Sequence, residues 1–168
     1  MFVLGVDPGL TRCGYGCVAD EHGREIAVAA GVITTDAHLP LPERLAELRG
    51  ELATLVHELE PAVVVVERVF FQTNARTAMS VGQASGIALV SAAEAGCAVA
   101  EYSANEVKLA VTGYGAATKE QVQRMVAELL RLPELPRPPD VADALALALC
   151  HLASSRASRL ATSGGRGA

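Results

Sequence analysis

The chain has 168 residues, 51% of them apolar and 20% charged, with a net charge of −5 at pH 7. This composition predicts a soluble globular protein with one compact core. No apolar run is long enough to cross a bilayer, and residues 1–4 lack the basic segment of a signal peptide, so we expect a cytoplasmic protein with no membrane partner.

Charge is distributed unevenly along the chain. Residues 1–103 carry 6 basic and 13 acidic groups, whereas residues 104–168 carry 8 basic and 6 acidic groups. The net negative charge argues against a general nucleic-acid-binding protein, but the second part can form a local basic surface for phosphate groups. The alternative is that these side chains are only solvated helix faces. The basic residues concerned are Lys108, Lys119, Arg124, Arg131 and Arg137.

Hydrophobic periodicity and turn residues predict a three-stranded meander followed by alternating strands and helices. This order predicts a mixed α/β fold. Its single folded domain spans residues 1–153. The expected strands are 2–7, 13–19, 25–34, 62–67 and 97–101, and the expected helices are 41–59, 74–95 with Asn74 as N-cap, 103–111, 118–131 and 140–155.

The last segment, residues 154–168, is rich in serine, glycine and alanine and carries three arginines but no acid. Such a composition buries too little apolar surface to offset the entropy of ordering. We expect a disordered basic tail with weak DNA contacts.

Four acids interrupt otherwise apolar segments. Asp7 and Glu67 each end an apolar run typical of a buried strand, and Asp140 and Asp143 lie three residues apart at the start of the last helix. If the two strands are parallel neighbours, their ends lie about 4.8 Å apart and their carboxylates converge at one sheet edge. A cluster of acids in such a place costs stability unless positive charge meets it.

Each acid also has an ordinary interpretation when taken alone. Asp7 can open the turn at Pro8-Gly9, Glu67 can be a strand-end charge, Asp140 can be an N-cap, and Asp143 can face the helix dipole. The coincidence of two buried strands and one helix start favours a joint metal site. Carboxylate oxygens suit Mg²⁺ or Mn²⁺ rather than zinc, and such sites commonly act on phosphates with two ions about 3.5–4 Å apart.

Four motifs occur in a specific order and spacing that resembles the RuvC family of Holliday-junction resolvases. They are Gly5-Val6-Asp7-Pro8-Gly9, Val65-Val66-Glu67-Arg68-Val69-Phe70-Phe71, Gly82-Gln83-Ala84-Ser85-Gly86 and Asp140-Val141-Ala142-Asp143-Ala144-Leu145-Ala146. The resemblance covers roughly residues 1 to 152. It implies a ribonuclease H-like fold, with a five-stranded mixed sheet flanked by helices, in which the first and fourth strands are adjacent.

The resemblance also implies an activity and its partners. Family members are homodimers that use Mg²⁺ to nick two opposing strands of four-way junction DNA during recombination and repair, and they work with a branch-migration helicase complex. For this chain it implies that Asp7, Glu67, Asp140 and Asp143 are catalytic ligands of two Mg²⁺ ions, with Mn²⁺ as a substitute. Asp7 would bridge both ions and Asp143 would hold the second ion or orient water. Some family members carry histidine at the position of Asp140, so this residue is either a ligand or a general base.

Further side chains are candidates for DNA contacts. Phe70 and Phe71 are either core residues or a stacking surface for an unpaired base, and the resemblance favours stacking by Phe70. Lys108 and Lys119 fall where the family has DNA-contacting lysines, and Arg76 is a further candidate phosphate contact.

The predicted helix over 74–95 has a stripe of mostly small residues, including Gly82 and Gly86. Such a stripe lets another backbone approach closely. The partner is either the sheet of the same chain or, as the resemblance implies, a second protomer.

Three alternatives to a resolvase have different requirements. An ATPase of the actin or sugar-kinase type would share the Asp7-Pro8-Gly9 loop, but 168 residues cannot readily build its two lobes. A ribonuclease H-like nuclease acting on structured RNA would keep the fold and change the substrate. A non-catalytic junction-binding protein would not need all four acids, which speaks against it.

Overall fold

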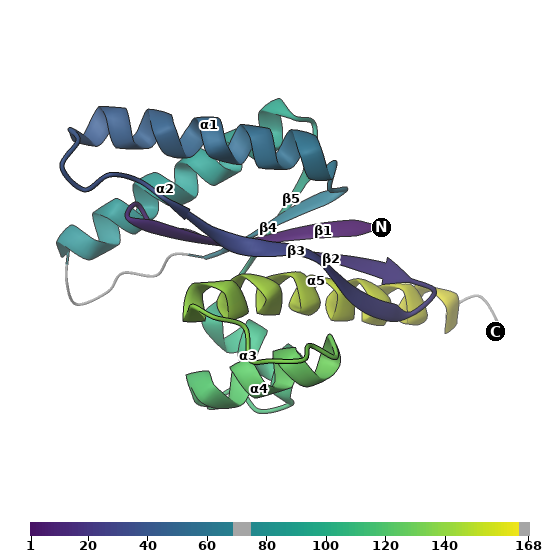
Figure 1. The fold of residues 1–168 in the computed structure, drawn as a ribbon. Helices are drawn as coiled ribbons and strands as arrows, with labels where there is room; N and C mark the ends of the chain where they lie inside the picture. The colour runs from purple at the N-terminus through teal and green to yellow at the C-terminus, as the bar shows by residue number, and fades with distance from the viewer. Residues whose placement is uncertain (69–74, 165–168) are drawn as a thin grey trace.

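Five strands form one sheet that carries helices on both faces (Figure 1). The computed structural model describes residues 1–68 and 75–164. The sheet has the strand order β3-β2-β1-β4-β5, which confirms the predicted mixed α/β fold class. In chain order the elements are β1 (Phe2–Asp7), β2 (Arg12–Glu21), β3 (Arg24–Thr34), α1 (Leu41–Leu59), β4 (Val63–Glu67), α2 (Ala75–Glu94), β5 (Ala98–Tyr102), α3 (Ala104–Thr112), α4 (Lys119–Leu129) and α5 (Pro139–Gly164).

The pairing between strands changes from antiparallel to parallel at β1, in the centre of the sheet. Strands β1, β2 and β3 pair antiparallel as a meander, whereas β4 is parallel to both β1 and β5. In the β1–β4 pair Val6 lies opposite Val66. The next residue of each strand is an acid, so the predicted adjacency of the first and fourth strands is confirmed.

Side chains of the central strands alternate between two cores. Val3 and Val65 are fully buried against α3, α4 and α5, whereas Leu4 and Val66 are fully buried against α1 and α2. Figure 1 shows these two helical layers on opposite sides of the sheet. Because side chains alternate along a strand, Asp7 follows the face of Val3, towards α5.

Helix α5 lies directly on the backbone of β1 and β2. A Cβ added at Gly5 would collide with the carbonyl oxygen of Ala144, and one added at Gly14 would collide with the carbonyl oxygen of Asp140. Only a residue without a side chain permits this approach. The close packing sets the first turn of α5 at the sheet edge where β1 ends.

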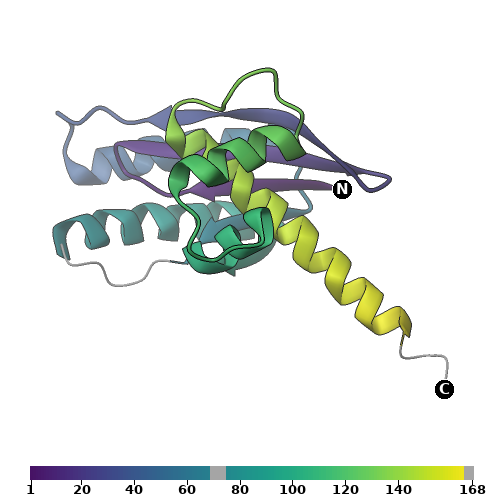
Figure 2. The same ribbon diagram turned by 90° about the horizontal axis from the view of Figure 1, so that it is seen from below.

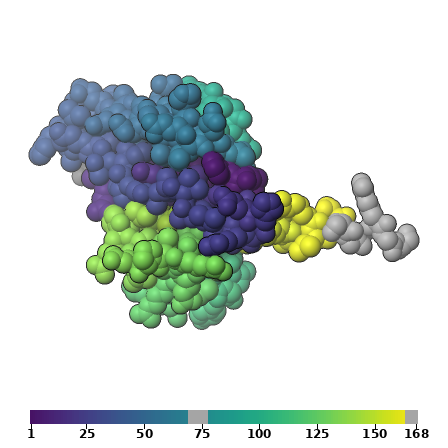
Figure 3. Space-filling model, turned by 45° about the vertical axis from the view of Figure 1, so that its right-hand side comes forward, coloured from purple at the N-terminus to yellow at the C-terminus, as the bar shows by residue number. Residues whose placement is uncertain are grey.

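The end of α5 differs from the prediction. The helix runs to Gly164 instead of ending near residue 155, so residues 154–164 are helical rather than a disordered basic tail, while 165–168 lie outside the described residues. Its final turns extend away from the sheet (Figures 2 and 3). Arg156 and Arg159 have acidic partners within the chain, which a composition-based prediction of disorder does not consider.

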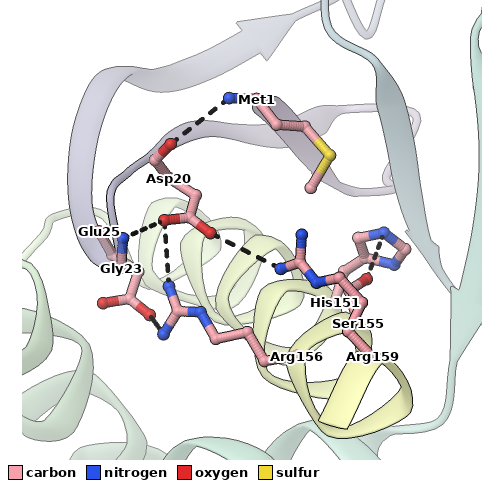
Figure 4. Close-up of polar contacts among 8 residues, drawn as sticks. All are labelled: Met1, Asp20, Gly23, Glu25, His151, Ser155, Arg156 and Arg159. Atoms are coloured by element: carbon pink, nitrogen blue, oxygen red, sulfur yellow. Dashed lines mark hydrogen bonds and ion pairs between the residues drawn. The ribbon is translucent and has the colours of Figure 1, made fainter. Parts of the chain in front are cut away.

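These partners belong to the β2–β3 hairpin (Figure 4). Arg156 pairs with Asp20 and Glu25, and Arg159 approaches Asp20 at 3.9 Å. Asp20 also accepts a 2.9 Å hydrogen bond from the backbone of Gly23 at the turn of this hairpin. The ion pairs therefore tie the helix to the first part of the chain.

Of the helices that the structure describes, none is long and apolar enough to cross a membrane.

Candidate active site

The four predicted acids meet at one edge of the sheet. Asp7 and Glu67 end β1 and β4, and Asp140 and Asp143 lie in the first turn and a half of α5. The pKa of Asp7 is raised to about 7, first by burial and then by the negative charges of Asp143, Glu67 and Asp140, in that order. Mutual repulsion of this kind requires the carboxylates to be close, so the structure brings the predicted set together.

Glu67 is in a similar environment. Its pKa is raised by burial first and by the charge of Asp143 second, while Lys119 acts in the opposite direction. Two half-buried carboxyl groups with raised pKa values thus lie on adjacent strands, where a bound cation would favour their ionised forms. Perturbed carboxyl groups in such a cluster are typical of functional sites.

Two basic side chains contact the acids of α5. The Nζ of Lys119 donates a 3.2 Å hydrogen bond to Oδ2 of Asp143, and the charge of Asp143 is the main reason that the pKa of Lys119 is raised. Lys119 is the first residue of α4, which Thr118 caps by accepting a hydrogen bond from the backbone of Gln121. The capped helix start directs the lysine towards the acidic edge.

The second basic side chain, Arg12, was not predicted as a site residue. One of its terminal nitrogens donates a 2.7 Å hydrogen bond to Oδ2 of Asp140. Arg12 begins β2, and in the β1–β2 hairpin this end of β2 lies beside Asp7, which pairs with Gly14. Arg12 and Gly14 lie on the same face of β2, and Gly14 lies beneath Asp140, a contact that only the folded structure reveals.

A cavity of about 100 Å³ opens beside the acids. Glu67 and Asp143 contribute negative charge to its wall, and the two predicted lysines Lys108 and Lys119 contribute positive charge. Both lysines thus lie in the wall of the same cavity as Glu67 and Asp143. The remaining lining is apolar and consists of Ala104, Val107, Val122, Ala146 and Leu147.

The donor chemistry of the edge fits a hard divalent cation. All four groups are carboxylates, the oxygen ligands that such a cation prefers, and positive charge beside Asp7 would favour the ionised form of its carboxyl group. Within residues 1–68 and 75–164, no three acid, histidine or cysteine side chains already have the arrangement of a metal site. Since Asp140 and Asp143 each contact a basic side chain, an ion shared by the four acids requires these two carboxylates to turn towards Asp7 and Glu67.

The remaining predicted DNA contacts lie in or next to residues 69–74, which are outside the described residues. Phe70, Phe71 and the expected N-cap Asn74 lie outside the described residues. Arg76 belongs to the first turn of α2, but its side chain is not among those described.

The small-residue stripe of α2 divides between two faces. Within the stripe, Ser85 is buried and Leu89 packs against the core beneath α1 and α2, in agreement with packing on the chain's own sheet. On other sides of the helix, a Cβ added at Gly82 or Gly86 would meet nothing within 4 Å, and Met79 is 66% exposed. Part of the stripe thus remains open to a partner.

The strand order, the two acids at neighbouring parallel strand ends and the two acids on the last helix define an α/β protein of the ribonuclease H-like class. A solved structure with the same fold, T. thermophilus RuvC in complex with Holliday junction substrate, matches with a TM-score of 0.89 and 39% identity over 94% of this chain and 96% of that chain.

The family model for "Crossover junction endodeoxyribonuclease RuvC" matches residues 3–151. A relative of that name from Syntrophomonas wolfei is 50% identical over 94% of this chain and 92% of its own length. Another, from Salinispora arenicola, is 54% identical over 90% of this chain and 87% of its own length. The chain belongs to the RuvC family of crossover junction endodeoxyribonucleases, and the predicted resemblance is confirmed.

Proposed function

We propose that this protein resolves four-way (Holliday) DNA junctions by paired symmetric nicks in two opposing strands, in recombination and repair. Membership of the RuvC family supports an endodeoxyribonuclease of this kind. The observation that carries the proposal is the convergence of four coupled carboxylates from β1, β4 and α5 at one sheet edge. Such a cluster of acids lowers the stability of the fold, and a non-catalytic junction-binding protein has no reaction that requires it.

The cofactor of the reaction is Mg²⁺, with two ions for each active site and Mn²⁺ as a substitute. The family is one of metal-dependent nucleases. Such ions supply an activated water and stabilise charge on the leaving oxygen. In our assignment Asp7 would hold both ions, Glu67 and Asp140 would hold one each, and Asp143 would hold the second ion or orient the attacking water. The coupling of Asp7 to the other three acids supports its central place.

Lys119 and Lys108 bind the DNA backbone beside the acids. Both line the cavity next to Glu67 and Asp143, which supports a role in holding the scissile phosphate and its neighbour. Arg76 contacts a phosphate further along the strand. Phe70 or Phe71 stacks on an unpaired base near the crossover, where stacking contributes about 1–3 kcal/mol for each base.

The active form is a homodimer that pairs through α2. The open space over Gly82 and Gly86 and the exposed Met79 support a close approach of two helices at this surface. A two-fold dimer presents two equivalent sites to a junction whose opposing strands are related by the same symmetry. Family resemblance further assigns a branch-migration helicase complex as partner and the cytoplasm as location.

The test is cleavage of a synthetic four-way junction, a matched linear duplex and an RNA–DNA hybrid, each with Mg²⁺ or with EDTA. We expect paired symmetric nicks on the junction alone, lost with EDTA and in Asp7→Asn. Binding of the junction without cleavage by the wild type, or faster cleavage of RNA, would contradict the proposal and leave the fold intact.

A further inference from the structure

Asp140 is held by a side chain from the other end of the sequence. A terminal nitrogen of Arg12 lies 2.7 Å from Oδ2 of Asp140, and the two residues are 128 positions apart. The side chain of Arg12 is 48% exposed and that of Asp140 is 28% exposed. The pair therefore lies at the rim of the acidic edge, where solvent and ligands reach it.

The backbone fixes the position of both partners. Arg12 is the first residue of β2, and Gly14, two residues further on the same face, lies against the backbone of Asp140. This contact leaves little freedom for the first turn of α5 to move relative to β2. The pairing of Arg12 with Asp140 thus follows from the packing of α5, whereas the guanidinium at the end of its long side chain keeps its own mobility.

The guanidinium of Arg12 has N–H donors that the contact with Asp140 does not use. It carries five N–H donors, and within residues 1–68 and 75–164 its hydrogen-bond partner is Asp140. A guanidinium binds phosphate with two parallel hydrogen bonds, a geometry that one carboxylate oxygen does not satisfy. A DNA phosphate at the acidic edge therefore competes with Asp140 for Arg12, while a divalent cation competes with Arg12 for Asp140.

We propose that Arg12 is a positioning residue that couples DNA binding to cation binding: its guanidinium occupies the carboxylate of Asp140 until a phosphate of the junction draws it away. This inference rests on the proposed function, since it takes Asp140 as a cation ligand. Arg12 thus binds either Asp140 or a DNA phosphate, but not both at once. Because coupling between two ligands is reciprocal, a junction raises the cation affinity of the site and a cation raises the junction affinity.

The chain offers a matched control in Arg49. Its terminal nitrogen pairs with Glu94 at the same distance of 2.7 Å, and the two side chains are 51% and 52% exposed. This pair joins α1 to α2, on the other face of the sheet from α5. Arg49→Gln removes an equivalent ion pair and the same charge without touching Asp140.

The first measurement is Mn²⁺ binding to the full-length protein without DNA, followed by electron paramagnetic resonance. We expect Arg12→Gln to bind Mn²⁺ about two- to fivefold more tightly than the wild type, the range that corresponds to release of an exposed ion pair. Arg49→Gln and Arg12→Lys, which keeps the positive charge, should both stay close to the wild-type affinity. An unchanged or weaker affinity in Arg12→Gln overturns the inference.

The second measurement is junction binding in EDTA over a range of salt concentrations, followed by fluorescence anisotropy. Loss of one phosphate contact should weaken binding by Arg12→Gln and lower its salt slope by about one for each protomer engaged. Arg12→Lys should keep the wild-type slope. An Arg12→Gln slope equal to that of the wild type overturns the inference, because Arg12 then has no phosphate partner.

The two proposals fail in different ways. If Mn²⁺ binds the wild type, is lost in Asp7→Asn and is unaffected by Arg12→Gln, the metal site stands and the role of Arg12 falls. If the wild type and Asp7→Asn bind Mn²⁺ equally, the metal site itself falls and the inference falls with it. Thermal melting of each variant ensures that these affinities are compared between folded proteins.

Discussion

Asp7 and Glu67 end two neighbouring parallel strands, one residue beyond the paired Val6 and Val66. Parallel strands point their carboxyl ends to the same edge, so this register alone sets two acids side by side. Burial is the main reason that the pKa values of both carboxyl groups are raised. The acids at this edge therefore lower the stability of the fold, and a bound cation would offset that loss.

This loss should appear in the pH dependence of stability. The pKa of Asp7 is about 7 in the fold against 3.8 for an ordinary aspartate, so the folded state holds its proton more tightly than the unfolded chain does. The contribution of Asp7 to stability is therefore greatest below pH 3.8, falls as the pH rises towards 7 and stays low above it.

Asp7→Asn should remove this penalty. In EDTA at pH 8 we expect the variant to exceed the wild type in free energy of unfolding by on the order of 2 kcal/mol, and at pH 4 the difference should nearly vanish. Urea unfolding at the two pH values measures it. Equal stability of both proteins at pH 8 would mean that Asp7 is not buried among like charges.

Lys119 should matter more for the reaction than for the fold. Lys119→Gln leaves Asp143 without its basic partner and removes a positive charge from the cavity beside Glu67. We expect the single-turnover cleavage rate to fall on the order of 100-fold, as when one group that stabilises a reacting oxyanion is removed.

The control for Lys119 is Arg124→Gln, which changes the same charge on the same helix but lines a separate hollow. It should leave the single-turnover rate near that of the wild type. Equal losses in both variants would indicate a general effect of charge on DNA binding rather than a specific role of Lys119.

The contact between α5 and β1 should not tolerate a methyl group. Gly5→Ala puts a Cβ into the carbonyl oxygen of Ala144, and the only relief is a shift of α5. We expect a loss of about 3 kcal/mol or more in the free energy of unfolding, together with loss of cleavage, because α5 carries Asp140 and Asp143. Urea unfolding and the junction assay measure the two effects.

Gly50→Ala gives the opposite expectation and serves as the control. Gly50 lies within α1, and a Cβ there would meet nothing within 4 Å. Replacing glycine by alanine inside a helix should raise the free energy of unfolding by about 0.5–1 kcal/mol. A loss at Gly5 no larger than ordinary surface substitutions would contradict the close approach of α5.

The end of α5 should contribute to stability through Arg156. This side chain pairs with Asp20 and Glu25, whose side chains are only 14% and 20% exposed (Figure 4). Arg156→Gln should lower the free energy of unfolding by about 1–2 kcal/mol, more than a fully exposed ion pair would. Junction affinity should be unchanged, whereas weaker junction binding with unchanged stability would favour a DNA contact instead.

Much of the fold could be predicted from local pattern. Apolar runs that end in acids marked β1 and β4, and two prolines before Asp140 marked the start of α5 within one residue. Hydrophobic period and caps depend on neighbours in sequence, so they are visible in the chain itself. The four acids could be assigned to one site for the same reason, since each lies at the end of a recognisable element.

The ion pairs and the close helix contact were decided only by the tertiary structure. Arg12 meets Asp140 across 128 residues, and Arg156 meets Glu25 across the whole domain. Neither pairing has a sequence signal of its own, because long polar side chains choose partners by proximity after folding. For this reason composition suggested a disordered tail where the structure has the end of a helix.

The sequence by itself thus determined the class of fold, the family and the four carboxylates of the candidate site. The tertiary structure decided which positive charges meet those carboxylates, because electrostatic contacts depend on distance in space and are screened by salt beyond about 10 Å. Register between β1 and β4 sets the acids together, and the glycine contact of α5 sets Arg12 against one of them.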